Sequence, residues 1–137
     1  MPKSVSLVVV LMVIWWSTPL HAATFQLCTS TEEPNCVLSG DTIRYQGASV
    51  RIEDIDAPNI EGYKCVTEQM LGVRAGLRLA ELLSAGPFDL IQVGNRTVDP
   101  IGRQLRSLHR NGQSIGMQLV NEGLAVRWEG HRHNWCS

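Results

Sequence analysis

The sequence between Ser39 and Asn59 constrains the fold most strongly, because turn signals and a proline divide it into short segments with strand-like alternation. A Gly-Asp pair precedes the segment from Thr42 to Tyr45, and a Gln-Gly pair precedes the segment from Ser49 to Ile55. Pro58 ends the second segment, since the residue before a proline avoids helix and proline cannot donate to a ladder. The stretch therefore predicts a β-hairpin.

The predicted hairpin carries a carboxylate at each end, Asp41 at its entrance and Asp56 at its exit, with Arg51 between them. Two carboxylates beside one arginine are typical of a site for a hard cation and a phosphate. Strict alternation places Arg51 and Asp56 on opposite faces, because five positions separate them. The two side chains can converge only if the strand twists or bulges between Asp54 and Asp56.

Two more motifs follow the hairpin. Residues 99–103 read Asp-Pro-Ile-Gly-Arg, and residues 119–125 read Leu-Val-Asn-Glu-Gly-Leu-Ala. Taken with the Gly-Asp-Thr turn and the Asp-Ala-Pro strand end, they resemble the motifs of the staphylococcal-nuclease (thermonuclease) family, in the same order, roughly over residues 37–128. The resemblance implies an enzyme that uses calcium to hydrolyse the phosphodiester bonds of DNA and RNA.

The resemblance also implies roles for individual residues. Asp41, Asp56 and the backbone carbonyl of Ala57 are expected to bind calcium, which prefers such oxygen donors. Arg51 and Arg103 are expected to clamp the phosphate and stabilise the charge that builds up at phosphorus. The residues alone leave other roles open: a turn former for Asp41, a cap for Asp56, and ion pairs with Glu53 or Asp99 for the arginines.

Asn59 departs from the family pattern, in which a glutamate proposed to activate the attacking water follows Asp-x-Pro. An amide does not accept a proton at neutral pH, so general-base help worth roughly 10²–10⁴-fold is expected to be missing. Glu61, two residues further on, is a candidate replacement, although a solvated loop carboxylate is the simpler interpretation. Ile101 likewise stands where many members of the family have an aromatic residue.

The remaining pattern predicts a mixed fold. Alternation and β-branched content indicate strands over 24–28, 37–45, 49–55, 88–93 and 104–110. A long helix is predicted from Glu68 to Ser84 with Thr67 as its N-cap, and a short helix is predicted between Ser114 and Gly123. We therefore expect a mainly β fold with helices (α+β), and specifically a five-stranded Greek-key barrel of the OB type, which is also the fold of the family.

The N-terminus reads as an export signal. Lys3 precedes an apolar run from Val5 to Trp16, and small residues follow at Ala22 and Ala23. The run is shorter than the ~20 residues of a spanning helix, although an uncleaved anchor is the alternative. We expect residues 1–23 to be removed and residues 24–137 to form one domain in the periplasm or the medium, as a monomer without stable membrane association.

Four cysteines suit an oxidising compartment and allow three pairings. Cys28 and Cys36 flank a polar loop that a disulfide would close, which leaves Cys65 to pair with Cys136. The competing interpretation is a metal site formed by His131, His133 and Cys136, but their spacing matches no common zinc pattern.

Charge and composition leave two main functions open. The chain is 44% hydrophobic and 18% charged with a net charge of −1, which is typical of a globular domain and not of a generally basic nucleic-acid binder. Positive charge is local, because six arginines follow Gly94 against three acidic residues. The alternatives to a nuclease are a non-catalytic barrel that binds nucleic acid, nucleotide or protein, and a disulfide-stapled structural module of the cell envelope.

Overall fold

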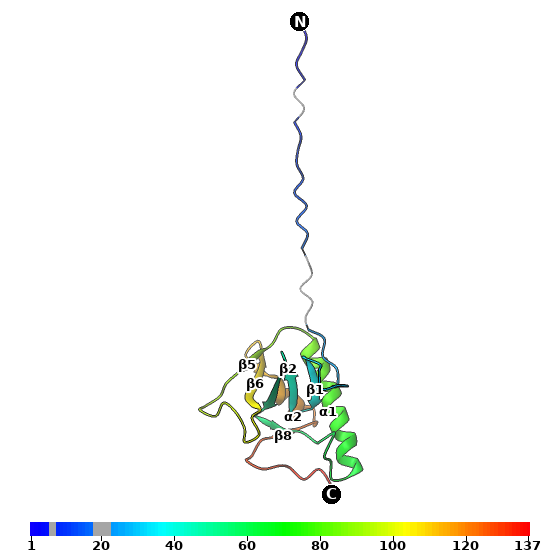
Figure 1. The fold of residues 1–137 in the computed structure, drawn as a ribbon, viewed down its shortest axis with the longest axis vertical. Coiled ribbons are helices and arrows are strands. Elements are labelled where there is room, and N and C mark those ends of the chain that lie inside the picture. Colours follow the sequence, from blue (N-terminus) through cyan, green and yellow to red (C-terminus); the bar gives the residue numbers. More distant parts are fainter. Residues whose placement is uncertain (6–7, 18–22) are drawn as a thin grey trace.

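The computed structural model describes residues 1–5, 8–17 and 23–137. Residues 1–5 and 8–17 are exposed, form no helix or strand, and extend away from the folded body (Figure 1). Ala22, one of the two predicted cleavage positions, lies outside the described residues, whereas Ala23 is exposed. Within the described ranges, no helix combines the length and the apolar character needed to cross a membrane.

The predicted hairpin is present as part of a three-strand meander. β1 (Cys36–Ser39), β2 (Thr42–Tyr45) and β3 (Ala48–Ile52) pair antiparallel in chain order. The strand predicted over 37–45 is therefore two strands, because the chain turns at Gly40. A Cβ on Gly40 would lie 2.7 Å from Cβ of Ala75, so only glycine lets this turn pack against the long helix.

The main sheet continues from β3 to β6 (Gln104–Arg110) and then to β5 (Asp89–Ile91), with the short strand β7 (Gln113–Ser114) also paired to β6. The β3–β6 pair is parallel, and the other pairs are antiparallel. The strand predicted over 104–110 has the observed bounds, whereas the one predicted over 88–93 is shorter. The strand predicted over 24–28 is reduced to a single bridge between Leu27 and Val37.

A second, two-stranded sheet forms below the first from β4 (Ile55–Asp56) and β8 (Val126–Arg127), which pair antiparallel (Figure 1). The prediction of one strand over 49–55 is therefore wrong. The chain leaves the main sheet after Ile52, turns at residues 53–54, and pairs with the C-terminal part of the chain instead. Because of this turn, the side chain of Asp56 points in a different direction from the one that a continuous strand over 49–55 would give it.

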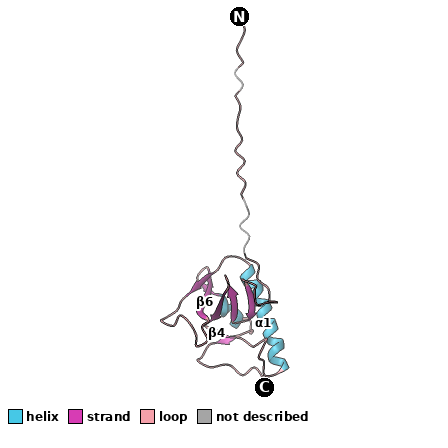
Figure 2. Cartoon of the chain, in the orientation of Figure 1, coloured by secondary structure: helices cyan, strands magenta, loops and turns pink. Residues whose placement is uncertain are grey.

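Within the part of the chain that the structure describes, two helices complete the α+β fold (Figure 2). α1 (Val66–Ser84) is capped by Cys65, whose sulfur accepts from the N–H of Glu68, so the predicted cap at Thr67 is wrong. α2 (Ile115–Asn121) is capped by Ser114 as predicted, and Gly123 follows it with a φ of 74°. A Cβ on Gly72 of α1 would lie 2.6 Å from the carbonyl oxygen of Asn59, so the helix packs closely against this carbonyl only because residue 72 is glycine.

The core fills the space between the main sheet and the two helices. Its fully buried members come from β1 to β4, from both helices and from β6, among them Ile43, Ile52, Leu79, Leu108 and Leu119. An aromatic group joins the ends of the sheet: the ring of Phe88, next to β5, lies 5.8 Å from Phe25 and 5.5 Å from Tyr45.

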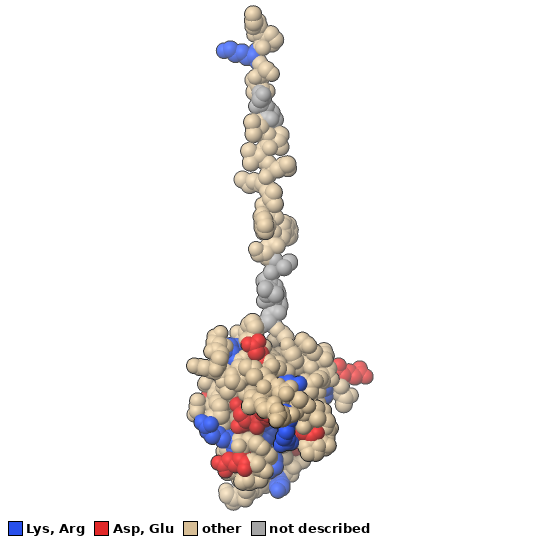
Figure 3. Space-filling model, turned by 90° about the vertical axis from the view of Figure 1, so that its left-hand side faces the viewer, with Lys and Arg blue, Asp and Glu red and all other residues tan. Residues whose placement is uncertain are grey.

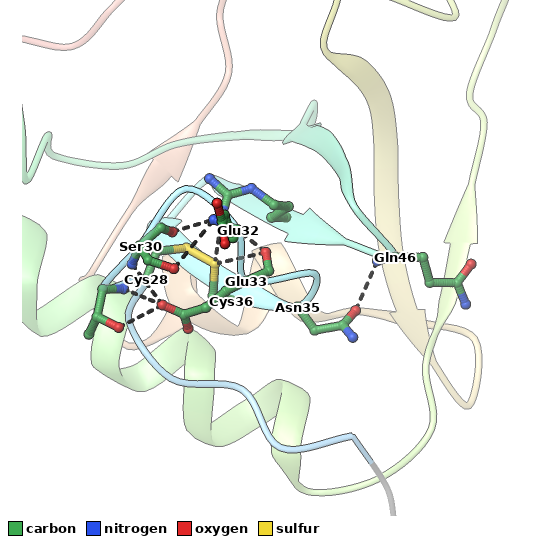
Figure 4. Close-up of a disulfide and its surroundings, with 9 residues drawn as sticks. Cys28, Ser30, Glu32, Glu33, Asn35, Cys36 and Gln46 are labelled. Atoms are coloured by element: carbon green, nitrogen blue, oxygen red, sulfur yellow. Dashed lines mark hydrogen bonds between the residues drawn. A yellow bond between two sulfur atoms is a disulfide. The ribbon is translucent and has the colours of Figure 1, made fainter.

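Both predicted disulfides are present, Cys28–Cys36 and Cys65–Cys136. The loop closed by Cys28 and Cys36 is also held by Glu33, whose carboxylate accepts from the backbone N–H groups of Thr29 and Ser30 at 2.6 and 2.8 Å (Figure 4). The longer-range disulfide joins the start of α1 to the end of the chain. The C-terminal segment is therefore tied to the folded body at a point close to the hairpin exit.

Candidate functional site

A cleft of about 420 Å³ opens beside the hairpin. It is lined by residues from β1 to β3, from the loop between β5 and β6, and from the C-terminal segment, including four arginines: Arg51, Arg96, Arg103 and Arg132. Asp41, Glu53 and Asp99 also line it, so opposite charges are interleaved there. On the face shown in Figure 3, acidic and basic side chains are likewise mixed rather than separated.

Asp41 and Arg51 line this cleft, and Asp56 is buried beside them. A terminal nitrogen of Arg51 lies 3.6 Å from Asp41 Oδ2 and 3.8 Å from Asp56 Oδ1. The three residues are buried, with Asp56 wholly inaccessible to solvent. In a single regular strand, alternation would place the side chains of Arg51 and Asp56 on opposite faces. The turn at residues 53–54 brings these side chains together, because β4 starts in a new direction.

Arg51 is fixed by several contacts at once. It donates to the carbonyl oxygens of Ile52 and Ile55, the latter at 3.0 Å, and its guanidinium lies 5.4 Å from the ring centre of Trp128. Burial lowers the pKa of Arg51, while the charges of Asp41 and Asp56 raise it. The ordinary pKa of an arginine side chain lies so far above neutral pH that Arg51 stays charged in spite of its burial.

Arg132, on the C-terminal segment, was not among the predicted site residues, yet it lies closest to the predicted cation ligands. Its Nη1 donates to Asp41 Oδ2 at 3.3 Å and to Asp56 Oδ1. Its Nη2 donates to the carbonyl oxygen of Ala57 at 3.2 Å and to Oδ1 of Asn59 at 2.7 Å. We refer to these four acceptors as the oxygen cage.

The oxygen cage fits a hard cation. It combines two carboxylates, a backbone carbonyl and an amide oxygen, which are the donor types that calcium takes in proteins. All four already accept from the guanidinium of Arg132, two from Nη1 and two from Nη2. Asp41 is held in position by the hydroxyls of Ser39 and Thr42, each at 2.9 Å, and by the N–H of Ala57 at 2.7 Å.

Asn59 and Glu61 lie differently with respect to the cleft. Asn59 lines it and belongs to the oxygen cage, because its amide oxygen accepts from Arg132. Glu61 is exposed and lines a second cavity of about 300 Å³, which shares Asn59 with the first. The cleft beside Arg51 and Arg103 therefore contains Asn59, and Glu61 faces the neighbouring cavity.

Glu68, on the first turn of α1, positions Asn59. Its carboxylate accepts from the backbone N–H of Asn59 at 3.1 Å and from that of Lys64 at 2.9 Å. Burial raises the pKa of Glu68, but these hydrogen bonds and the charge of Arg132 outweigh burial and lower it. Sequence reasoning missed this residue, and the only signal for it was an acidic side chain in the first turn of a predicted helix.

Arg103 lies on the loop side of the cleft. Its Nε donates to Asp99 Oδ2 at 2.5 Å, and the N–H of Gly102 donates to the carbonyl oxygen of Asp99 at 3.0 Å, which closes a β-turn over residues 99–102. Burial raises the pKa of Asp99, but the hydrogen bonds and charge of Arg103 lower it overall. The ion pair uses one edge of the guanidinium, and the side chain remains 31% exposed toward the cleft.

The alternative metal site at the C-terminus is wrong, because Cys136 is bonded to Cys65. His133 contributes its backbone N–H to Asp56 Oδ2 at 2.8 Å, and its ring packs edge-on against Trp135. Among the residues that the structure describes, no three histidine, cysteine, aspartate or glutamate side chains gather as a metal site. The oxygen cage has only two acidic side chains and completes its donor set with neutral oxygens.

Comparison with models of known protein families finds no match to this chain, and no curated protein matches it significantly. The chemistry of the cleft must therefore be inferred from its own residues.

Proposed function

We propose that the protein is an exported, calcium-dependent phosphodiesterase that hydrolyses DNA or RNA. The observation that carries this proposal is that Arg51 lies beside the carboxylates of Asp41 and Asp56, next to a cleft that Arg51, Asp41 and Arg103 line. Carboxylates that hold a cation beside arginines that bind phosphate are the parts that phosphodiester hydrolysis requires. The resemblance of three sequence motifs to the thermonuclease family points to the same chemistry.

In this proposal Asp41, Asp56, Ala57 and Asn59 would hold the calcium ion, which when bound supplies positive charge for a phosphate oxygen. Arg51 and Arg103 bind the other phosphate oxygens from two sides of the cleft and stabilise the charge that grows on them. Water attacks phosphorus and passes a proton to the solvent, the bond to the leaving oxygen breaks, and that oxygen takes up a proton from the solvent. Asn59 can orient the water by accepting or donating a hydrogen bond, but it cannot remove a proton.

The strand order supports the finer fold proposal of an OB-type Greek-key barrel. The order β1-β2-β3-β6-β5 with a parallel β3–β6 pair is the order of such a barrel before closure. The contact between Phe25, which precedes β1, and Phe88, which precedes β5, brings the two edges of the sheet toward each other. Export is supported by the two disulfides and by the signal-like residues 1–23.

A second candidate is a non-catalytic module that binds nucleic acid, nucleotide or protein in the same cleft. Asn59 favours it, because an amide in the place of the family's glutamate removes the general base while preserving the cation ligand.

The two candidates are separated by incubating the secreted protein with single-stranded DNA and RNA, in calcium and in EGTA. We expect calcium-dependent cleavage that Asp41→Asn and Arg103→Gln each reduce by at least about 10²-fold, as removal of a charge-stabilising group does elsewhere. Arg74→Gln, on the exposed face of α1, removes the same charge away from the cleft and should leave the rate unchanged. Calcium-independent binding without cleavage would favour the non-catalytic module.

A further inference from the structure

The cleft contains two arginines that face the same pair of carboxylates, and they differ in how firmly they are held. Arg51 lies within β3, its side chain is only 9% exposed, and it also donates to two backbone carbonyls. Arg132 lies outside any helix or strand, and its side chain is 40% exposed. Of the two guanidinium groups, that of Arg132 is the one that can leave without disrupting the sheet.

The segment that carries Arg132 is held at both ends. β8 pairs with β4 just before it, and the Cys65–Cys136 disulfide anchors it just after. Between these anchors, the N–H of His133 donates to Asp56, which also accepts from Arg132. The segment from Trp128 to Cys136 therefore acts as a strap that keeps Arg132 at a high local concentration beside the oxygen cage.

The charges around the cage show what Arg132 does to the site. With Arg132 in place, two arginines face the three carboxylates of Asp41, Asp56 and Glu68, so the group has a net charge of −1. A divalent cation in place of Arg132 would bring the net charge of the group to zero and would release the guanidinium at the rim of the cleft, where a phosphate would enter. The guanidinium and a divalent cation cannot occupy the same four oxygens at once.

We propose that Arg132 is a built-in competitor for the cation site, which sets the calcium affinity of the oxygen cage and becomes available to phosphate when calcium displaces it. This inference rests on the calcium site of the proposed function. The apparent affinity of calcium is reduced by the fraction of molecules in which the cage is free. A guanidinium that fills the cage in 90–99% of molecules would thus weaken calcium binding by roughly 10–100-fold.

The test is calorimetric titration of calcium chloride into the wild-type protein and into Arg132→Gln. We expect Arg132→Gln to bind calcium at least about 10-fold more tightly than wild type. Arg132→Lys should fall between them, because an ammonium keeps the charge but cannot bridge four acceptors. Arg127→Gln is the matched control, since it removes the same charge from an exposed position five residues away, and it should bind as wild type does.

Two results would overturn the inference and separate it from the proposed function. Equal or weaker calcium binding by Arg132→Gln, with clear binding by wild type, would leave the calcium site intact and show that Arg132 does not compete. Absence of calcium binding in both proteins would overturn the inference and the calcium dependence together.

If Arg132→Gln does not fold, hydrogen exchange of the wild-type protein tests the inference instead. Calcium should then speed hydrogen exchange at the N–H of His133, which is bonded to Asp56, because displacement of Arg132 loosens the strap. Unchanged exchange at saturating calcium would contradict displacement.

Discussion

At the scale of single residues, the interpretation of the site depends most on Asn59. Its amide oxygen accepts from Arg132, while its backbone N–H is held by Glu68, so its position is well defined although its chemistry is passive. The residue keeps an oxygen donor for a cation and gives up proton transfer. The protein is therefore expected to be a slow nuclease with an intact cation site.

The variant Asn59→Glu tests this interpretation. A carboxylate at this position can accept a proton from water, so the calcium-dependent cleavage rate of single-stranded DNA should rise by about 10-fold or more. Glu61→Gln is the control, and it should change the rate by less than about 2-fold because Glu61 lines the neighbouring cavity. A fast wild-type enzyme that Glu61→Gln inactivates would identify Glu61 as the base instead.

Glu68 carries a second prediction at this scale, on acid stability. A carboxylate whose folded-state pKa is lowered stabilises the fold above its unfolded-state pKa of about 4.3 and loses that contribution as the pH falls through the folded-state value. Urea unfolding should show that Glu68→Gln loses less stability than wild type below about pH 4.3. Exposed Glu32→Gln should follow the wild-type curve, and parallel curves for all three proteins would contradict the assignment.

At the scale of secondary-structure elements, the contact between α1 and the hairpin exit positions the oxygen cage. Gly72 packs against the carbonyl oxygens of Asn59 and Pro58, so α1 sets the distance between these residues and the rest of the site. A methyl group there would force the backbone of the exit segment outward. The helix therefore has a residue of poor helix propensity at a position where the contact with Asn59 and Pro58 leaves no room for a side chain.

We expect Gly72→Ala to destabilise the protein by about 1–3 kcal/mol, despite the better helix propensity of alanine, and to weaken calcium binding. Gly86→Ala is the matched control, because the nearest atom to its added Cβ lies 3.9 Å away. Chemical denaturation and calorimetry measure the two effects. A stabilised Gly72→Ala with unchanged calcium affinity would show that the close contact does not position the cage.

The elements that local sequence patterns specify were predictable, and those that depend on distant partners were not. The Gln46-Gly47 turn, the strand over 104–110 and the Ser114 cap each follow from neighbouring residues, and all are present. The end of β3 was missed, because its cause is the pairing of β4 with β8, more than 70 residues later. Arg132 was missed for the same reason, since no local pattern links it to Asp41.

At the scale of the whole molecule, the two disulfides constrain different parts of the chain. Cys28 and Cys36 are 8 residues apart and close a loop that hydrogen bonds from Glu33 already order. Cys65 and Cys136 are 71 residues apart and join the start of α1 to the strap that carries Arg132. The cysteine pairing was predictable from loop lengths, but its consequence for the site was not.

Loop-closure entropy predicts that the Cys65–Cys136 bond stabilises the fold by about 4 kcal/mol and the Cys28–Cys36 bond by about 2.5 kcal/mol. Urea unfolding of the paired serine variants, Cys65→Ser with Cys136→Ser and Cys28→Ser with Cys36→Ser, should show the larger loss for the first pair. The reverse order would mean that the strap contributes little to global stability.

The central question about this molecule is whether the oxygen cage and the arginines form one site for a cation and a phosphodiester. A short single-stranded DNA with cleavage-resistant phosphorothioate linkages isolates binding from chemistry, and fluorescence anisotropy measures its affinity in calcium and in EGTA. We predict that calcium tightens DNA binding by about 5–150-fold, that DNA tightens calcium binding by the same factor, and that Asp41→Asn abolishes both effects. Equal DNA affinity in calcium and in EGTA would contradict the account.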